Sequence, residues 1–481
     1  MIYEKIKNNK IIKAVCAFQA TSVYIYVLCA LAVLSNAFGL DAFIIAPMLI
    51  LLCITNLFAD NVIYASPVVF TVAFCISPQH SPAKGDLSYY LSVPFLCVIG
   101  PLVLAVFITA IIRAVKNKNF KNISFKRGLA LGAVAYSAAL LLNGTFSAGH
   151  DILDFSVGAL TVFTIAGLYF FFVATIDGEN INYEYLCTAM VASGFVALLQ
   201  LGVIYLKNVG SFTALDNEWK WLLYSGWGIS NTIGQYVAMM IPPCFYFAIK
   251  KGRILTSFVL AAFLYAGTYF SLCRSGMLIG AAVCLVCVIL TCIFVENKKR
   301  SIICTVIFGS LLALVYFVSF FGKKFPDFFD FLRNVGFSDR GRFEIWKNSV
   351  DLFLKNPVFG AGFNAYSRDY NCGFSLGFAH NTPIQILSSC GAVGVIAFVY
   401  FRVQTVKLCV HKITPVRALL IMEILSYIAL GWLDITGFSP YFNIVFAVLI
   451  AAMEKESLIG ENFCATLFIN KRNSIAAKAK I

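Results

Sequence analysis

Apolar residues occur in runs of roughly twenty along most of the chain, and short polar segments separate one run from the next. A helix needs about 20 mainly apolar residues to cross the hydrocarbon core of a bilayer. The pattern therefore predicts an all-α, polytopic membrane bundle of about 12–14 transmembrane helices. The expected spans are residues 15–36, 42–59, 61–78, 89–112, 129–144, 155–176, 184–206, 232–249, 254–272, 275–296, 302–321, 383–401, 417–434 and 441–458.

One segment between spans, residues 322–382, is long enough to be a functional loop of about 60 residues. Its stretch SDRGRFEIWKNSVDLFLKNP opens with Ser338, a favourable N-cap residue. Apolar side chains then recur at helical spacing until proline and glycine interrupt the pattern. We expect an amphipathic helix that lies on the membrane surface. Its apolar positions are Phe343, Trp346, Val350 and Phe353, and the interruption consists of Pro357, Gly360 and Gly362.

Basic residues cluster in alternate loops between the expected spans, as the positive-inside rule requires of cytoplasmic loops. The short acidic loop at residues 177–183 is an exception. The rule places both termini in the cytoplasm and the loop at residues 322–382 outside. The basic clusters lie at residues 5–13, 113–127, 250–253, 298–300, 402–417 and 471–480.

Composition strengthens the membrane interpretation. Hydrophobic residues make up 60% of the chain and charged residues 12%, whereas typical soluble domains carry about 25% charged residues. So much apolar surface excludes a water-soluble fold, and we interpret residues 1–481 as a single integral membrane domain. The net charge of +14 comes from short basic clusters and forms no continuous basic face, so no nucleic-acid partner is expected.

His380 is one of only four histidines and stands directly before an expected span, in the stretch AHNTPIQILSSCGAVGV. Asn381 or Thr382 can cap that helix, with Pro383 in its first turn. The N–H groups and dipole of a helix N-terminus attract anions and disfavour a protonated imidazole. We therefore expect an uncharged His380 that accepts a proton beside a bound anion. The alternative is a histidine that only caps and packs.

Arg274 interrupts roughly 40 apolar residues in the stretch YFSLCRSGMLIG. A charge at the bilayer centre is costly, so Arg274 is expected at the external end of a span, in one compartment with Arg340, Arg342 and His380. Arginine suits a diphosphate because its planar, always-charged guanidinium makes bidentate contacts. The sequence has no Walker loop, dinucleotide fingerprint, HExxH or paired acidic motif, so neither a nucleotide cofactor nor a metal is expected.

Several stretches, taken together and in order, resemble the O-antigen ligase and polysaccharide polymerase family of bacterial membrane proteins. GRFEIWKNSVDLFLKNPVFGAGFNAYS and AHNTPIQILSSCGAVGV follow the family signature of Arg-x-x-x-Trp, Pro-x-x-Gly-x-Gly, and His-Asn before a helix with paired glycines. TYFSLCRSGMLIG is similar to its Ser-Arg-Gly helix end, with Cys273 where the family often has serine. GWGISNTIGQYVAMMIP is similar to its Asn-containing span. The matching residues are Asn231, Arg274, Arg342, Trp346, Pro357, Gly360, Gly362, His380, Asn381, Gly391 and Gly394.

The resemblance implies a membrane glycosyltransferase that takes a glycan linked through diphosphate to a polyprenol, such as undecaprenol, and passes it to an acceptor hydroxyl. Such an enzyme works by inversion, without metal or nucleotide. His380 would be the catalytic base, and Arg274 and Arg342 would bind the diphosphate, with Arg340 a weaker candidate. Asn381 and Trp346 would complete the substrate-binding set, and the tryptophan-rich loop at residues 207–231 would stack on sugars.

Within this reading, a polymerase that joins lipid-linked repeats into capsule or other surface polysaccharide is favoured over an O-antigen ligase that moves finished glycan to a lipid carrier. The expected location is the bacterial cytoplasmic membrane, and other polysaccharide-assembly proteins are expected partners. A flippase for lipid-linked glycan is an alternative of another class, although it should carry charges along several helices. A cell-shape or division-type glycosyltransferase would instead rely on an external acid, for which Asp327, Asp330 and Asp339 are the candidates.

Overall fold

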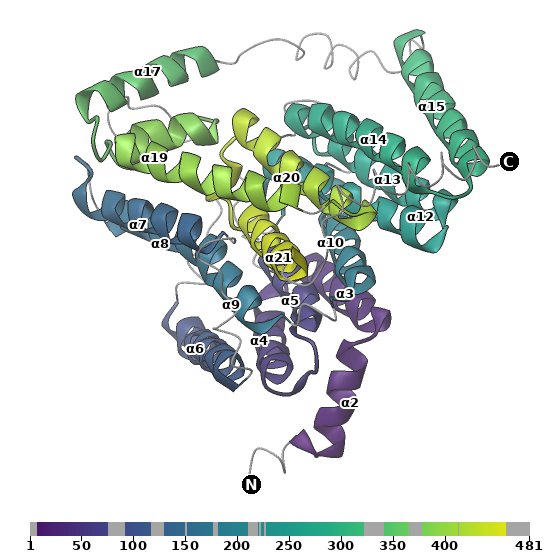
Figure 1. The fold of residues 1–481 in the computed structure, drawn as a ribbon, viewed down its shortest axis with the longest axis horizontal. Coiled ribbons are helices and arrows are strands. Elements are labelled where there is room, and N and C mark those ends of the chain that lie inside the picture. The colour runs from purple at the N-terminus through teal and green to yellow at the C-terminus, as the bar shows by residue number, and fades with distance from the viewer. Residues whose placement is uncertain are drawn as a thin grey trace, which may run out of the picture.

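The computed structural model of the chain is helical almost throughout its described parts, which confirms the all-α class (Figure 1). One antiparallel pair of two-residue strands, β1 (Tyr224–Ser225) and β2 (Gly228–Ile229), is its only sheet among the described residues. The structure describes residues 7–75, 92–116, 129–149, 152–176, 181–209, 220, 223–225, 228–321, 341–363, 365, 378–411 and 413–457.

The helices follow the apolar runs of the sequence. In the first half they are α2 (Lys10–Gln19), α3 (Ser22–Phe38), α4 (Asp41–Phe58), α5 (Ser66–Thr71), α6 (Val93–Lys116), α7 (Ala130–Phe146), α8 (Ile152–Val162), α9 (Leu168–Thr175) and α10 (Tyr183–Ile204). In the second half they are α11 (Ser230–Met239), α12 (Tyr246–Lys251), α13 (Ile254–Phe270), α14 (Arg274–Phe294), α15 (Lys298–Phe321), α17 (Arg342–Lys355), α19 (Thr382–His411), α20 (Pro415–Leu433) and α21 (Pro440–Ser457).

Seven helical segments in the described part are long and apolar enough to cross a membrane, or eight if the bent pair α2–α3 is one span. A polytopic helical bundle is therefore confirmed, but fewer helices reach span length than the 12–14 expected. Several apolar runs form shorter pieces because turns interrupt them. The run expected at residues 61–78 is divided into two 3₁₀ turns around the six-residue α5, and the run at residues 42–59 gives a helix whose apolar part is Phe43–Phe58.

Burial separates inner helices from outer ones. In the segment Ser230–Lys251, 83% of the apolar window is buried inside the protein, whereas the corresponding share for α6 is 6%. The helix α21 is also deeply buried, and its residues Tyr441–Lys455 are nearly inaccessible. Because lipid is the solvent around a membrane span, an apolar helix that is exposed along its length is one that faces lipid. In Figure 1, α6 accordingly lies at the edge of the bundle and α21 near its centre.

The amphipathic helix predicted in the long loop is present as α17 and begins at Arg342, after Gly341 as its N-cap, rather than at Ser338. Its protein-facing side chains are Ile345 and Leu352, which pack with three alanines of the neighbouring segments. Of the apolar stripe expected to meet the membrane, Phe343 and Val350 stay exposed, at 67% and 40%, whereas Trp346 packs against the protein. The helix thus has two apolar sides, one against the protein and one available to lipid.

The helix α19 is not one straight span. Gly391 has φ 60° and ψ −159°, which divides it into the pieces 382–390 and 392–411. A Cβ on Gly394 would lie 3.4 Å from Ile386 Cγ2, although eight residues of continuous helix would separate the two by about 12 Å along the axis. The chain therefore folds back on itself, and Figure 1 shows the two pieces side by side. The expectation of a single uninterrupted span at residues 383–401 is wrong.

The loop that carries the Pro-x-x-Gly-x-Gly motif, residues 356–363, fills this break. A broken helix inside a membrane protein leaves backbone N–H and C=O groups that need partners. Here the loop and the break exchange four backbone hydrogen bonds, each 2.8–3.2 Å long. They run from Ala361 N to Ser388 O, Gly362 N to Ser389 O, Ala392 N to Pro357 O and Val393 N to Val358 O.

Two glycines make this close backbone contact possible. Gly360 has φ 76°, and a Cβ there would collide with the backbone of Ser389. On the other side of the contact, a Cβ on Gly391 would lie 2.5 Å from the carbonyl oxygen of Val358. Both positions combine a left-handed backbone with no room for a side chain, which is where glycine is required. The motif glycines therefore serve to join the loop to the folded-back helix.

Candidate active site

The imidazole of His380 pairs with a carboxylate at the end of another helix. His380 Nδ1 lies 3.1 Å from Oδ1 of Asp434, the residue that directly follows α20. An ionised carboxylate only accepts hydrogen bonds, so Nδ1 carries the proton in this pair. A neutral ring then has its lone pair on Nε2, as a general base requires. The His380 side chain keeps 20% of its surface exposed, so the ring can be reached from outside the protein.

The surroundings of Asp434 favour its ionised form. Burial alone raises the pKa of this carboxyl, but the hydrogen bond and charge of His380 outweigh burial and hold the pKa below its usual value. The backbone N–H of Ile435, 2.9 Å from Oδ1, and the nearby charge of Arg342 act in the same direction. Asp434 is therefore a carboxylate at neutral pH and fixes the orientation of the histidine.

Asn381 holds the backbone next to His380 in place. Its Oδ1 accepts a hydrogen bond from the backbone N–H of Ile384 at 3.0 Å, which confirms the prediction that Asn381 can cap this helix. Its Nδ2 donates to the carbonyl of Trp432 at 2.9 Å and so ties the start of α19 to the end of α20. The neighbouring His380 has φ +48°, a conformation that costs energy in a residue other than glycine and persists only where surrounding contacts impose it.

Trp346 supports the same segment from the other side. Its indole N–H donates to the carbonyl of Ala379 at 2.9 Å, one residue before His380. The N–H of Ala379 in turn donates to Gln385 Oε1 at 2.7 Å, so both backbone groups of this residue are engaged. The tryptophan of the Arg-x-x-x-Trp motif therefore reaches the histidine segment through a specific hydrogen bond.

The starts of three helices are linked around Asp434. Arg342 is the first residue of α17, and its charge acts on Asp434. Arg274 is the first residue of α14, and the adjacent Ser275 accepts a hydrogen bond at 2.8 Å from Gln235 Nε2, which also donates to Asp434 Oδ2 at 3.2 Å. The third helix, α19, donates from its first N–H to the carbonyl of Asp434 at 3.1 Å. Helix N-termini that carry arginine are favourable places for an anion.

Some predicted site residues fall outside the described part of the chain. Arg340 is one of them, and so are the three tryptophans of the loop at residues 207–231 and the three acidic candidates of the long loop. Among the residues that the structure does describe, no three His, Cys, Asp or Glu side chains gather as a metal site would require. The three tryptophans are Trp219, Trp221 and Trp227, and the three acidic candidates are Asp327, Asp330 and Asp339.

Sequence reasoning missed Asp434 and Gln235. Asp434 closes the run expected to span at residues 417–434, and Gln235 lies inside the run at 232–249. A polar residue within or at the end of a membrane span is expensive and commonly functional, so both carried a usable signal. The contacts of Asp434 with Gln235 and His380 could not be predicted, because these residues come from segments far from Asp434 in the sequence.

Residues 257–399 match the family model for O-antigen ligase. The resemblance inferred from sequence motifs is confirmed over this range, which extends from α13 to the second piece of α19. The matched range contains Arg274, Arg342, Trp346 and His380, whereas Asp434 and Gln235 lie outside it. A search of curated proteins finds no match.

The O-antigen ligase match supports, in broad terms, a membrane glycosyltransferase of the ligase or polymerase type acting on a lipid-linked glycan. Multiple apolar helices agree with a protein that works within a membrane. The pair of His380 and Asp434 adds the kind of base that transfer to a hydroxyl needs.

Proposed function

We propose that this protein polymerises polyprenyl-diphosphate-linked oligosaccharide units into a surface polysaccharide, by a metal-independent, inverting transfer to a glycan hydroxyl. The observation that carries the proposal is the contact between His380 and Asp434 at the junction of three helix N-termini, two of which begin with arginine. A base next to an anion site is the arrangement that transfer from a diphosphate leaving group needs.

In this mechanism His380 Nε2 removes the proton from the acceptor hydroxyl while Nδ1 stays hydrogen-bonded to Asp434. The hydroxyl oxygen attacks the anomeric carbon of the donor from the face opposite the diphosphate. A new carbon–oxygen bond forms as the bond to the phosphate oxygen breaks, which inverts the configuration at that carbon. The electron pair leaves with polyprenyl diphosphate, and the carboxylate of Asp434 stabilises the imidazolium that results.

The leaving diphosphate is assigned to Arg274 and Arg342, because fixed guanidinium groups and helix N-termini stabilise negative charge as it develops. Arg340 is a weaker candidate for the same task. Asn381 and Trp346 remain proposed members of the substrate-binding set. Their observed hydrogen bonds support a contribution through the position of His380, since each holds backbone beside it.

The proposed location is the cytoplasmic membrane of a bacterium. Residues 1–481 form one integral membrane domain in this proposal, with both termini in the cytoplasm and residues 322–382 on the outer side, together with the site. The alternation of basic loops supports this orientation. Such a protein meets its lipid-linked donor after the donor has been moved to the outer leaflet.

The test is transfer by purified, full-length protein in nanodiscs, supplied with lipid-linked repeat units extracted from cells that lack the polymerase. The wild type should release polyprenyl diphosphate and form a ladder of longer glycans, also in the presence of a metal chelator. His380→Ala should lower the rate by about 10²- to 10⁴-fold, as expected for loss of a general base. His411→Ala, at the exposed far end of α19, is the matched control and should keep the wild-type rate.

Each failure has its own meaning. A His380→Ala rate equal to that of His411→Ala would overturn the assignment of the base. Transfer only after addition of a separate lipid acceptor would replace the polymerase by a ligase. In cells, His380→Ala should leave unpolymerised lipid-linked units on the outer side of the membrane, and their retention inside would support a flippase instead.

A further inference from the structure

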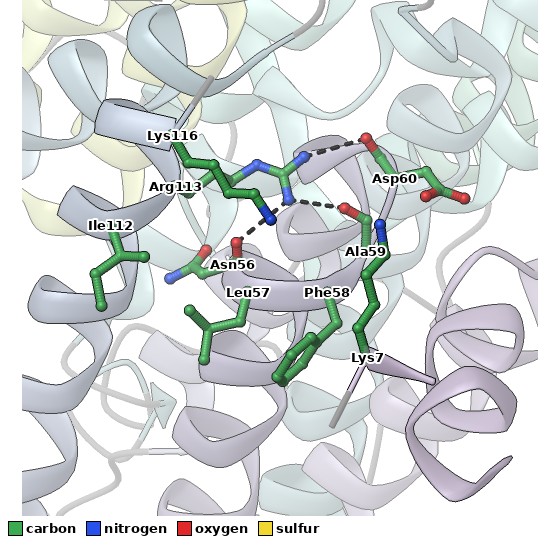
Figure 2. A pocket seen from close by; sticks show the side chains of 9 residues that line it. All are labelled: Lys7, Asn56, Leu57, Phe58, Ala59, Asp60, Ile112, Arg113 and Lys116. Atoms are coloured by element: carbon green, nitrogen blue, oxygen red, sulfur yellow. Dashed lines mark hydrogen bonds between the residues drawn. The ribbon is translucent and has the colours of Figure 1, made fainter. Parts of the chain in front are cut away.

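A second polar site lies where α4 ends beside the end of α6. It is a pocket of about 210 Å³ between the two helices and the start of the described chain (Figure 2). In Figure 1, α2, α4 and α6 occupy the lower part of the molecule, whereas α14, α17 and α19 occupy the upper part, so this pocket is separate from the candidate active site. Its lining residues are Lys7, Asn56, Leu57, Phe58, Ala59, Asp60, Ile112, Arg113 and Lys116.

The floor of the pocket is a buried arginine with a fixed position. Arg113 is 8% exposed, and its guanidinium donates hydrogen bonds to four backbone carbonyls at the end of α4. The shortest, from Nη1 to Ala59 O, is 2.7 Å, and Nη2 reaches Asp60 O at 3.1 Å. Thr55 O also accepts the backbone N–H of Ala59, but the last carbonyls of a helix lack partners within it, so the arginine helps to satisfy them and complements the helix dipole. Its charge is therefore held at the base of the pocket.

Two lysines complete a cationic surface above this arginine. Lys7 precedes α2 and Lys116 is the last residue of α6, so they come from different parts of the fold, and both are exposed. Figure 2 shows the Lys116 side chain extending toward the Arg113 guanidinium and the Lys7 side chain ending beside Ala59 and Asp60. Asp60 is the one acidic residue in the lining, against three cations. The pocket thus favours a compact anion, and phosphate is the biological anion that lysine and arginine commonly bind.

The position of the pocket along α6 indicates where that phosphate comes from. The helix is the least buried of the seven described helices that are long enough to span a membrane, and Ile111 and Val115, close to its end, are 58% and 61% exposed. Apolar side chains that face lipid reach to within one residue of Lys116. The lysine therefore lies at the level where hydrocarbon gives way to headgroups, and basic pockets at this level bind anionic lipid headgroups.

We propose that this pocket binds the phosphate of an anionic phospholipid headgroup, with Lys7 and Lys116 contacting the phosphate and Arg113 supplying a fixed positive charge beneath it. The acyl chains of the lipid lie along the exposed apolar side of α6. This site does not depend on the proposed glycosyltransferase activity, because it shares no residue with the site around His380.

The test counts lipids that remain bound to the full-length protein by native mass spectrometry, with phosphatidylglycerol, phosphatidylcholine and inorganic phosphate as separate probes. The wild type should retain one phosphatidylglycerol saturably. The double variant Lys7→Gln, Lys116→Gln should bind it about 30-fold more weakly, because each lysine near a membrane surface contributes about 1 kcal/mol. Lys116→Arg keeps the charge and should retain most of the binding.

The matched control is the double variant Lys10→Gln, Lys13→Gln. It removes the same charge from two exposed positions on the neighbouring α2 that do not line the pocket. Its affinity for phosphatidylglycerol should stay within about threefold of the wild type. The two removed charges lie outside the pocket, and salt screens their attraction to the lipid headgroup. An equal loss in both double variants, equal retention of phosphatidylcholine, or saturation by inorganic phosphate alone would each overturn the proposal. A thermal melt confirms that the variants are folded.

Discussion

At the scale of single residues, His380, the proposed base, and its carboxylate partner Asp434 come from different parts of the chain and meet through a hydrogen bond. The strained backbone of His380 is held in place by Asn381 and, through Ala379, by Trp346. Asp434 receives the backbone N–H of Ile435 in addition to the imidazole. In the proposed reaction, such support would fix the ring orientation before substrate arrives and so lower the cost of reaching the transition state.

Asp434→Asn tests the carboxylate without a change of shape. We expect the transfer rate to fall by about 10²- to 10⁴-fold, because an amide neither fixes the tautomer of His380 nor stabilises an imidazolium. The acid limb of the rate–pH profile should also move to lower pH, since the protonated ring loses its negative neighbour. The measurement is the initial transfer rate from about pH 5 to 9, covering the range in which histidine titrates.

Asp434→Glu is the companion variant, because it restores the charge at a slightly different reach and should recover part of the rate. An Asp434→Asn enzyme with an unchanged pH profile would show that the carboxylate does not act on the histidine.

The same carboxylate also makes the stability of the fold depend on pH. Folding lowers the pKa of Asp434, so its stabilising contribution is complete above the ordinary aspartate range, near pH 4, and is lost as pH falls through the lowered value.

At the scale of elements, the folded-back helix explains why a motif loop and a pair of glycines occur together. The first piece of α19 carries the histidine segment, and the break that follows it needs the loop at residues 356–363 as a backbone partner. A straight α19 without the break could not fold back, so residues 382–390 would no longer lie beside residues 392–411. The geometry around His380 therefore depends on a contact that begins eight residues further along the chain, at Ser388.

Gly391→Ala should break this arrangement. The left-handed backbone disfavours a side chain, and a methyl group would stand 2.5 Å from the carbonyl oxygen of Val358. We expect a loss of about 1–3 kcal/mol from backbone strain alone, more from the collision, and a large fall in transfer rate. Thermal unfolding of the purified protein and the nanodisc transfer reaction measure the two effects.

The control for this substitution is Gly309→Ala in α15, where a Cβ meets nothing within 4 Å. Alanine is the better helix former there, so stability should stay the same or rise by up to about 1 kcal/mol. If Gly391→Ala behaved like Gly309→Ala in both measurements, the break would not be required for the site.

The sequence predicted much at this scale and missed one kind of feature. Apolar runs located nearly all helices, and helical spacing predicted α17, because burial in lipid leaves a strong pattern. The break in α19 was not predictable in the same way, since the apolar run continues through it and only Gly391 marks it. The pairing of His380 with Asp434 depends on how α19 and α20 pack, which periodicity does not describe.

At the scale of the whole molecule, the two sites discussed above occupy different ends of the bundle (Figure 1). The candidate active site lies among α14, α17, α19 and α20, and the basic pocket lies between α4 and α6. The predicted topology, in which the basic loops are cytoplasmic and residues 322–382 are external, would place the two sites on opposite sides of the membrane. The lipid donor and the proposed phospholipid then belong to opposite leaflets.

The orientation of the chain can be checked directly. Green fluorescent protein fused to the C-terminus should fluoresce in intact bacteria, because it folds in the cytoplasm, where the positive-inside rule places this end. Alkaline phosphatase fused at the same position should be inactive, and active when inserted after Lys355 in α17, which the topology places outside. The reverse pattern would invert the bundle and move the site around His380 to the cytoplasmic side.

The location of Asp434 has a consequence for biosynthesis. Every element of the recognisable motif has been synthesised by residue 394, yet the histidine acquires its carboxylate partner only when the chain has grown through α20. A nascent or shortened protein that ends before that point carries the full signature of the family without the group that orients its base. In the proposed reaction, sugar transfer would therefore begin only after the membrane bundle is almost completely translated.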